Sequence, residues 1–303
     1  MEEHKKANLF VVGAMRAGTT SLMSVLEQHP EIYASPIKEP NYFVDRLPKE
    51  VYSPDKKFIE ASYFKIDFPK KLHIAHIQSK AAYEQLFSFA TDQKYRVEAS
   101  TCYLHAPGTP SKLKQYNPNA KIIVLLRDPV ERAYSQYAMN VGLGRENKSF
   151  EAVVKKELNE LQNGPLPWHS IIHMSCYDTA VEIYSQLFDN VCVLPLTHLL
   201  DAPKEAFNTI AEFLQIAPFH STFLPKTNQA IHFKNKQIVY LLKKVGLKRL
   251  VSSGLGSSTK QKILGALSRK NATPLIPEIL EKQLREVFAA RSLVYFDSIE
   301  RTT

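Results

Sequence analysis

The sequence predicts an α/β protein in which a central, mainly parallel sheet is flanked by helices. Over the first two-thirds of the chain, short apolar runs alternate with segments of helical periodicity, which is typical of βαβ units. The clearest run, residues 121–126, is apolar after its first residue, as in a strand buried on both faces. The chain of 303 residues, 44% of them hydrophobic, is long enough to bury a full core.

The expected elements follow in order, separated by breakers. Strands are expected at residues 9–12, 32–34, 95–98, 121–126 and 191–196. Helices are expected at residues 20–28, 81–89, 150–161, 176–187 and 204–214. The pair Asp128-Pro129 opens a further helix, with Asp as N-cap and Pro in the first turn. Pro36 and Pro40 bracket an expected loop.

The C-terminal third has a different pattern. The strand pattern stops after Ile216, and residues 234–250 and 276–290 look helical, with a Gly- and Ser-rich loop between them. We expect a single domain over residues 1–303. Its core would be residues 8–216, and residues 217–303 would form a basic helical cover.

The positive charge lies mainly in that C-terminal part. The chain carries a net charge of +9, yet residues 213–277 contain eleven Lys or Arg and no Asp or Glu. Such a segment is expected to face an anionic partner, either an acidic or glycan acceptor or an anionic membrane, although a solvated basic surface stays open. The apolar stripe of residues 234–250 would ordinarily face a core. Nucleic acid is not expected, because no recognised binding module accompanies the charge.

The sequence shows no obvious membrane or export signal. No apolar run approaches the roughly 20 residues that span a bilayer, and the run after Lys5-Lys6 is too short for a signal peptide. We therefore expect a cytoplasmic protein, with peripheral membrane association left open. The three cysteines have no metal-binding spacing, so we expect reduced thiols and no metal site, with a Cys176–Cys192 bridge as the alternative.

A glycine-rich turn follows the first expected strand. Gly13 and Gly18 are separated by four residues and precede a helix, which is the geometry of a phosphate-binding loop. Nucleotide-hydrolysing loops carry Lys directly after the second Gly, where this sequence has Thr19, and the cation here is Arg16. This difference argues against an ATPase or kinase and favours an anion held without a dedicated metal. A tight turn with no ligand is the alternative.

Two motifs resemble those of PAPS-dependent sulfotransferases, where PAPS is 3′-phosphoadenosine-5′-phosphosulfate. Residues 10–22 resemble the family's phosphosulfate loop, Gly-x-x-Lys/Arg-x-Gly-Thr-Thr-x-Leu, and residues 126–137 resemble its Arg-Asp-Pro signature with a later Ser. The resemblance covers roughly residues 8–216 and implies a P-loop-type three-layer fold with PAPS as co-substrate. The nucleotide-binding residues it implies are Arg16, Ala17, Gly18, Thr19, Thr20 and Ser21, with Arg127 and Ser135 on the 3′-phosphate.

The segment Lys38–Phe43 resembles the Glu-x-x-Phe-Phe segment of heparan-sulfate-type and bacterial sulfotransferases. Their catalytic base is that Glu, which implies Glu39; the alternative is an exposed loop carboxylate paired with Lys38. Cytosolic small-molecule sulfotransferases use a His instead, and of His73, His76 and His105 the last is the best placed by sequence. Arg16 would act by charge alone, since Arg cannot release a proton at neutral pH.

Two departures from the family pattern bear on the acceptor and on the nucleotide cover. Residues 98–103 resemble the family's Glu-Lys-Ser-Pro-x-Tyr strand end, but Ala99 stands where heparan-type enzymes carry Lys, which weakens a heparan-like assignment. Past Ile216 the match is loose, and Lys234 is the expected counterpart of the cationic loop that closes over the nucleotide. Residues 44–80 and 142–173 are expected to shape the acceptor pocket.

The predicted function is transfer of a sulfuryl group from PAPS to a hydroxyl or amine, releasing 3′,5′-adenosine bisphosphate (PAP). The acceptor would be a carbohydrate, a lipid or a small secondary metabolite. A P-loop kinase or NTPase is one alternative, and a non-catalytic nucleotide-binding, membrane-associated module is another. The residues do not specify the acceptor, the choice between O- and N-sulfation, or the oligomeric state.

Overall fold

The computed structural model describes residues 6–52, 58–224, 232–233, 268–269 and 276–292. The chain forms two compact units. The first comprises residues 1–128, 176–227 and 290–303, and the second comprises residues 129–175 and 228–289.

The first unit is built on a five-stranded parallel sheet. Its strands are β1 (Leu9–Gly13), β2 (Ile32–Ala34), β5 (Tyr95–Ala99), β6 (Lys121–Leu126) and β7 (Val191–Pro195). Their order is β2-β5-β1-β6-β7, and Leu9 of the central strand pairs with Val97 on one side and Lys121 on the other. All five residues of β1 are buried, because an apolar strand covered on both faces has no solvent side. The predicted strands are confirmed.

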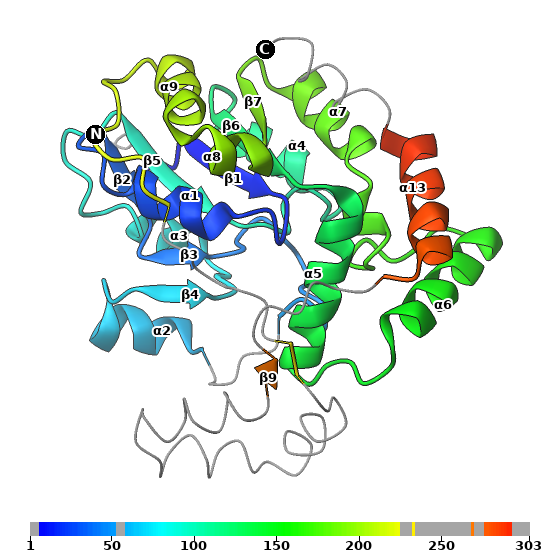
Figure 1. Cartoon of the computed structure of the whole chain (residues 1–303). Coiled ribbons are helices and arrows are strands. Elements are labelled where there is room, and N and C mark those ends of the chain that lie inside the picture. The colour runs from blue at the N-terminus through cyan, green and yellow to red at the C-terminus, as the bar shows by residue number, and fades with distance from the viewer. Residues whose placement is uncertain (1–5, 53–57, 225–231, 234–267, 270–275, 293–303) are drawn as a thin grey trace. The chain divides into compact units, whose positions relative to one another are not determined.

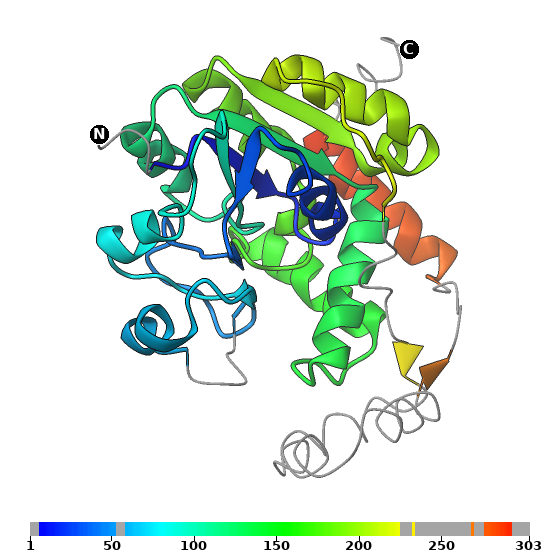
Figure 2. The ribbon, with the colours of Figure 1, turned by 90° about the vertical axis from the view of Figure 1, so that its left-hand side faces the viewer.

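Helices cover both faces of this sheet (Figure 1, Figure 2). One face carries α1 (Thr19–Leu26), α8 (Leu196–Asp201) and α9 (Pro203–Leu214), and the other carries α3 (Lys80–Gln85), α4 (Thr109–Tyr116) and α7 (Asp178–Leu187). Right-handed crossovers require this division, because the chain moves from β1 toward one sheet edge and from β5 toward the other. The predicted three-layer α/β architecture is confirmed.

A second, two-stranded parallel sheet was not predicted. The strands β3 (Ile37–Glu39) and β4 (Leu72–Ile74) pair where a loop was expected between Pro36 and Pro40, and α2 (Glu60–Ser62) and the π-helix η2 (Tyr63–Asp67) lie between them in the chain. The loop expectation was wrong because a three-residue strand is too short to show alternation. This small sheet fixes the backbone at Glu39.

The second unit is mostly helical. It contains α5 (Pro129–Gly142), α6 (Phe150–Asn163), the short helix η3 (His173–Ser175) and most of α13 (Glu278–Ser292). The predicted helices at 150–161 and 276–290 are confirmed. The expectation that strands end after Ile216 was wrong, because β8 (His232–Phe233) and β9 (Ser268–Arg269) form a short antiparallel pair.

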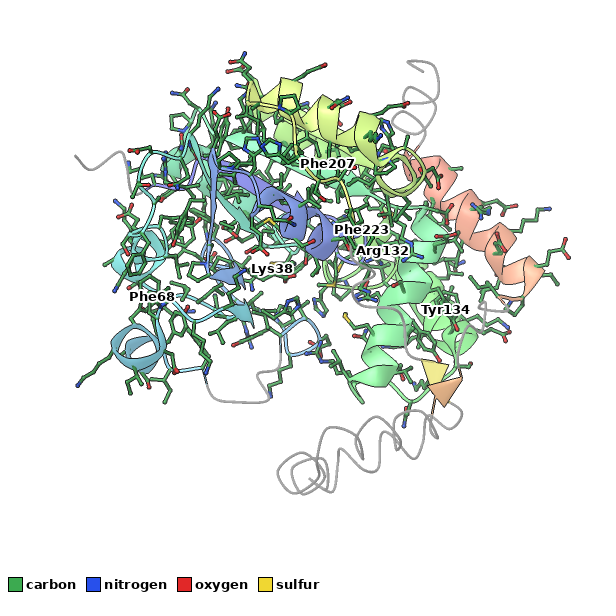
Figure 3. The ribbon with its side chains drawn as sticks, turned by 60° about the vertical axis from the view of Figure 1, so that its left-hand side comes forward. Lys38, Phe68, Arg132, Tyr134, Phe207 and Phe223 are labelled. Atoms are coloured by element: carbon green, nitrogen blue, oxygen red, sulfur yellow. The ribbon has the colours of Figure 1, made fainter. Side chains whose placement is uncertain are left out.

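A buried arginine ties the helices of the second unit together. Arg132 on α5, labelled in Figure 3, is fully buried, and its guanidinium donates to Ser175 Oγ, Gln136 Oε1 and the Ile171 carbonyl, each at 2.7 Å. Glu157 on α6 accepts from the backbone N–H groups that follow, at Ile171 and Ile172. These hydrogen bonds offset much of the cost of burying the charge.

Most of the basic C-terminal segment falls outside the described residues. This holds for the helix expected at residues 234–250, for the Gly- and Ser-rich loop after it and for Lys234. In α13, Leu280, Leu284 and Phe288 are buried at helical spacing. Within the described ranges, no helix combines the length and hydropathy needed to cross a membrane.

Candidate active site

The sheet topology gathers the predicted site at one edge. Residues 14–18 follow β1, Thr101 follows β5 and Arg127 follows β6. Because β1 lies between β5 and β6 and all three run parallel, their carboxyl ends open on the same side. Ligands of open α/β sheets bind at this edge.

The loop between β1 and α1 is held by backbone bonds and by a glycine that cannot be replaced without strain. The Ala14 N–H donates to the Leu125 carbonyl of β6 at 2.6 Å. Gly18 has φ 88°, and a Cβ there would lie 2.6 Å from Leu196 Cδ1 on α8. A side chain would therefore meet both a disfavoured backbone region and a steric contact.

Two guanidinium groups lie near each other at this edge. The Arg127 side chain places Nη1 3.4 Å from the Arg16 carbonyl oxygen, and Tyr177 Oη donates to the Arg127 carbonyl at 3.0 Å. Burial lowers the pKa of Arg16, the charge of Arg127 lowers it further, and Glu39 opposes both. The two positive charges repel each other, and an anionic ligand bound beside both of them would offset this repulsion.

Glu39 is a buried carboxylate beside these cations. Only 8% of the residue is exposed, although it does pair with Lys38, whose Nζ lies 2.9 Å from Oε1 (Figure 3 labels Lys38). Thr101 Oγ1 donates to the other oxygen, Oε2, at 3.3 Å. The carboxylate is thus not the exposed loop group of the alternative, because β3 and the β5 end hold it from both sides.

Asn41 fixes the chain just after Glu39. Its backbone adopts a φ of 52°, and its side-chain Nδ2 donates to the carbonyls of Glu39 and Ala75, each at 2.9 Å. Cys102 Sγ donates to Asn41 Oδ1 at 2.9 Å. The amide therefore uses both ends to join the ends of β3 and β4 to the turn after β5.

The three histidines occupy different places. His73 on β4 interacts electrostatically with the charged residues of the site. Burial lowers its pKa, the charge of Glu39 raises it, and the charges of Lys38 and Arg16 lower it. The Nε2 of His105 lies 3.1 Å from the Cys176 carbonyl, and that of His76 lies 2.8 Å from the Val44 carbonyl. Sequence reasoning favoured His105 and missed the position of His73, because the β3–β4 pairing leaves no local signal.

A second buried acid, Glu98, lies near the carboxyl end of the strand β5. Its residue is fully buried, Tyr83 Oη donates to Oε1 at 3.0 Å, and Ser100 Oγ donates to Oε2 at 2.8 Å. Burial raises the pKa of the Glu98 carboxyl to about 7, hydrogen bonds oppose the rise, and the charge of Glu39 adds to it. The sequence shows the motif at residues 98–103, but the burial of Glu98 and its raised pKa could not be predicted from that motif.

The remaining predicted residues are divided between the two units. Thr19 is buried, and Thr20 and Ser21 are half-buried in the first turn of α1. Ser135 is buried on α5 of the second unit, and Lys234 lies outside the described residues. The first unit thus brings together the loop, Arg16, Arg127 and Glu39.

The fold and the site define an α/β protein with a glycine-containing loop and two neighbouring arginines at the carboxyl edge of its sheet. A family model described as "Sulfotransferase family" matches residues 8–220. The chain belongs to the sulfotransferase family.

Similar proteins are known from several organisms. The chain is 30% identical over 161 residues to the membrane-associated sulfotransferase kil1 of Dictyostelium discoideum, and 28% identical over 177 residues to human carbohydrate sulfotransferase 15. These matches cover 51% and 52% of this chain but only 29% and 31% of the relatives' lengths. A crystal structure of a sulfotransferase from Alicyclobacillus acidocaldarius is 28% identical, with a TM-score of 0.58, covering 82% of this chain and 97% of that one.

Proposed function

We propose that this protein transfers a sulfuryl group from PAPS to a hydroxyl or amine of an acceptor and releases PAP. The observation that carries the proposal is the convergence of the phosphate loop, Arg16, Arg127 and the buried Glu39 at one edge of the sheet. Membership of the sulfotransferase family supports it.

The donor would be held by its anionic groups. The backbone N–H groups of the loop and the first turn of α1 suit the 5′-phosphosulfate, with Arg16 as the cation and the hydroxyls of Thr19, Thr20 and Ser21 beside it. Arg127 at the end of β6 suits the 3′-phosphate, because a guanidinium binds phosphate oxygens in pairs. The family signature adds Ser135 to that phosphate and Lys234 to the nucleotide cover.

In the transfer step, Glu39 acts as the general base. The acceptor oxygen or nitrogen attacks sulfur and forms the new bond as Glu39 takes its proton, while the S–O bond to the 5′-phosphate breaks and its electron pair stays on the phosphate oxygen. Arg16 stabilises the negative charge that builds there. Lys38 and Thr101 orient the two oxygens of the Glu39 carboxylate.

The acceptor is proposed to be a glycan or a small molecule. The similarity to a carbohydrate sulfotransferase supports a sugar hydroxyl or amine, and the similarity to a membrane-associated relative supports a lipid or a site near a membrane. The basic composition of residues 213–277 supports peripheral contact with an anionic membrane.

Calorimetric titration separates this function from that of a P-loop kinase. We expect PAP to bind in the absence of metal with micromolar or better affinity, and ATP with magnesium to bind weakly, because Thr19 replaces the lysine that nucleotide-hydrolysing loops require. If ATP with magnesium bound and PAP did not, the proposal would be overturned.

The role of Arg127 is tested by comparing two nucleotides that differ in one phosphate. Replacing Arg127 with Ala should weaken PAP binding roughly 10- to 100-fold, the range of a charge-assisted pair, and leave 5′-AMP binding nearly unchanged. An equal loss for both nucleotides would show that Arg127 supports the loop rather than the 3′-phosphate.

A further inference from the structure

The Glu98 carboxyl is fully buried beside the site. Its two oxygens accept hydrogen bonds from two different elements, Tyr83 Oη on α3 at 3.0 Å and Ser100 Oγ after β5 at 2.8 Å. A buried acid is expensive to desolvate, so its retention with satisfied oxygens suggests a role beyond packing.

Hydrogen bonds connect Glu98 to the loop that carries Glu39. Ser100 uses its proton on Glu98, which leaves its oxygen to accept the Asn41 backbone N–H at 3.1 Å. Asn41 in turn holds the Glu39 carbonyl through its side-chain amide. The path from Tyr83 therefore reaches the backbone of Glu39 through hydrogen bonds and through the covalent frame of Asn41.

The two carboxyls also influence each other through charge. Glu39 on β3 is the charged group that acts on Glu98 from a neighbouring element. The other titratable groups that face Glu98 are neutral hydroxyls and a thiol: Tyr83 on α3, Cys102 and Tyr103 after β5, Tyr116 on α4 and Tyr184 on α7. The low dielectric around Glu98 strengthens both its interaction with Glu39 and its hydrogen bonds.

We propose that Glu98 is a positioning residue for the base Glu39, whose backbone it holds through Ser100 and Asn41 when its own carboxyl is ionised. The inference rests on the proposed role of Glu39. The ionised carboxylate accepts on both oxygens, from Tyr83 and Ser100, whereas protonation of one oxygen turns that acceptor into a donor and disturbs the network. Turnover should therefore rise as Glu98 ionises.

The test is the pH dependence of kcat with saturating PAPS. The wild-type protein should show a rise in kcat with an apparent pKa of about 7, the value for Glu98. Glu98→Gln should abolish that rise and lower kcat on the order of 10-fold at about pH 8, while the KM for PAPS changes less than about twofold. A rise of the same midpoint in the Gln variant would overturn the proposal.

A second variant keeps the acid and changes its midpoint. The Tyr83 hydroxyl lowers the pKa of Glu98, so Tyr83→Phe should move the kcat rise to higher pH. Tyr95→Phe is the matched control. Tyr95 lies on β5 like Glu98, but its hydroxyl donates to the Leu214 carbonyl and not to Glu98. An unmoved midpoint in Tyr83→Phe, or the same movement in both variants, would contradict the role of Glu98.

Glu39→Gln distinguishes this inference from the function on which it rests. If Glu39→Gln retained full transfer, the assignment of the base would fail whatever Glu98 does. If Glu39→Gln abolished transfer and Glu98→Gln kept the wild-type pH profile, only the inference about Glu98 would fail.

Discussion

At the scale of single residues, the site combines groups that are unfavourable in isolation. Burial and the charge of Arg127 lower the pKa of Arg16, and Glu98 is buried within the electrostatic influence of Glu39. Such arrangements are typical of functional sites, where a ligand or a reaction makes use of the stored electrostatic cost. A consequence for stability follows from the Glu98 carboxyl.

Glu98 should make the folded state less stable as pH rises. Its pKa is about 7 in the folded protein, against 4.5 for an exposed glutamate, so between these values the folded state holds a proton that the unfolded state has lost. The contribution of Glu98 to the free energy of unfolding should therefore fall by up to about 3 kcal/mol over that range and stay constant above it.

Urea unfolding of wild type and Glu98→Gln checks this. The variant should gain stability relative to wild type on going from about pH 5 to about pH 8, because Gln does not ionise. A difference between the two proteins that is independent of pH would show that Glu98 does not titrate in this range.

At the scale of elements, the turn between β1 and α1 depends on Gly18. Gly18→Ala should lower the free energy of unfolding by about 1–2 kcal/mol through the left-handed backbone, and should also weaken PAP binding because Leu196 must move beside the loop. Gly108→Ala is the control, since its φ is 73° and no atom lies within 4 Å of its added Cβ. Equal effects of both substitutions on PAP binding would contradict a specific role for Gly18.

The elements that could be predicted from sequence are those with a strong local signal. The apolar runs of β1 and β6 predicted those two strands closely. The pairing of β3 with β4 could not be predicted, because each has three residues and the partners lie far apart in the chain. The buried setting of Glu39 and the nearness of His73 depend on that pairing. The sequence alone therefore could not decide whether Glu39 is a base in the site or an exposed loop carboxylate.

At the scale of the whole molecule, the order of the motifs along the chain carried the most information. The glycine loop and the Arg-Asp-Pro signature follow β1 and β6, which are adjacent in the sheet, so Arg16 and Arg127 could be assigned together. The network of Glu98, Ser100 and Asn41 could not, because hydrogen bonds between distant segments leave no periodic pattern.

The net charge of the chain gives a prediction about membranes. The full chain should co-sediment with vesicles that contain phosphatidylserine and not with phosphatidylcholine vesicles, and raised salt should release it. Replacing Lys243, Lys244 and Lys248 with Glu should weaken this binding by at least about 3 kcal/mol, at roughly 1 kcal/mol for each lysine lost. Unchanged vesicle binding by that variant would show that these three lysines do not contact the membrane.

The central claim, that Glu39 is the base of a PAPS-dependent sulfuryl transfer, is tested most directly by radiolabelled transfer. Labelled PAPS is incubated with a panel of carbohydrate, lipid and small-molecule acceptors, using wild type and Glu39→Gln, and PAP binding by both proteins is measured in parallel. We predict transfer to at least one acceptor class by wild type, a loss of about 10²- to 10⁴-fold in the variant, and equal PAP binding. Full transfer by Glu39→Gln, or tight PAP binding by a wild-type protein that labels no acceptor on the panel, would contradict the account.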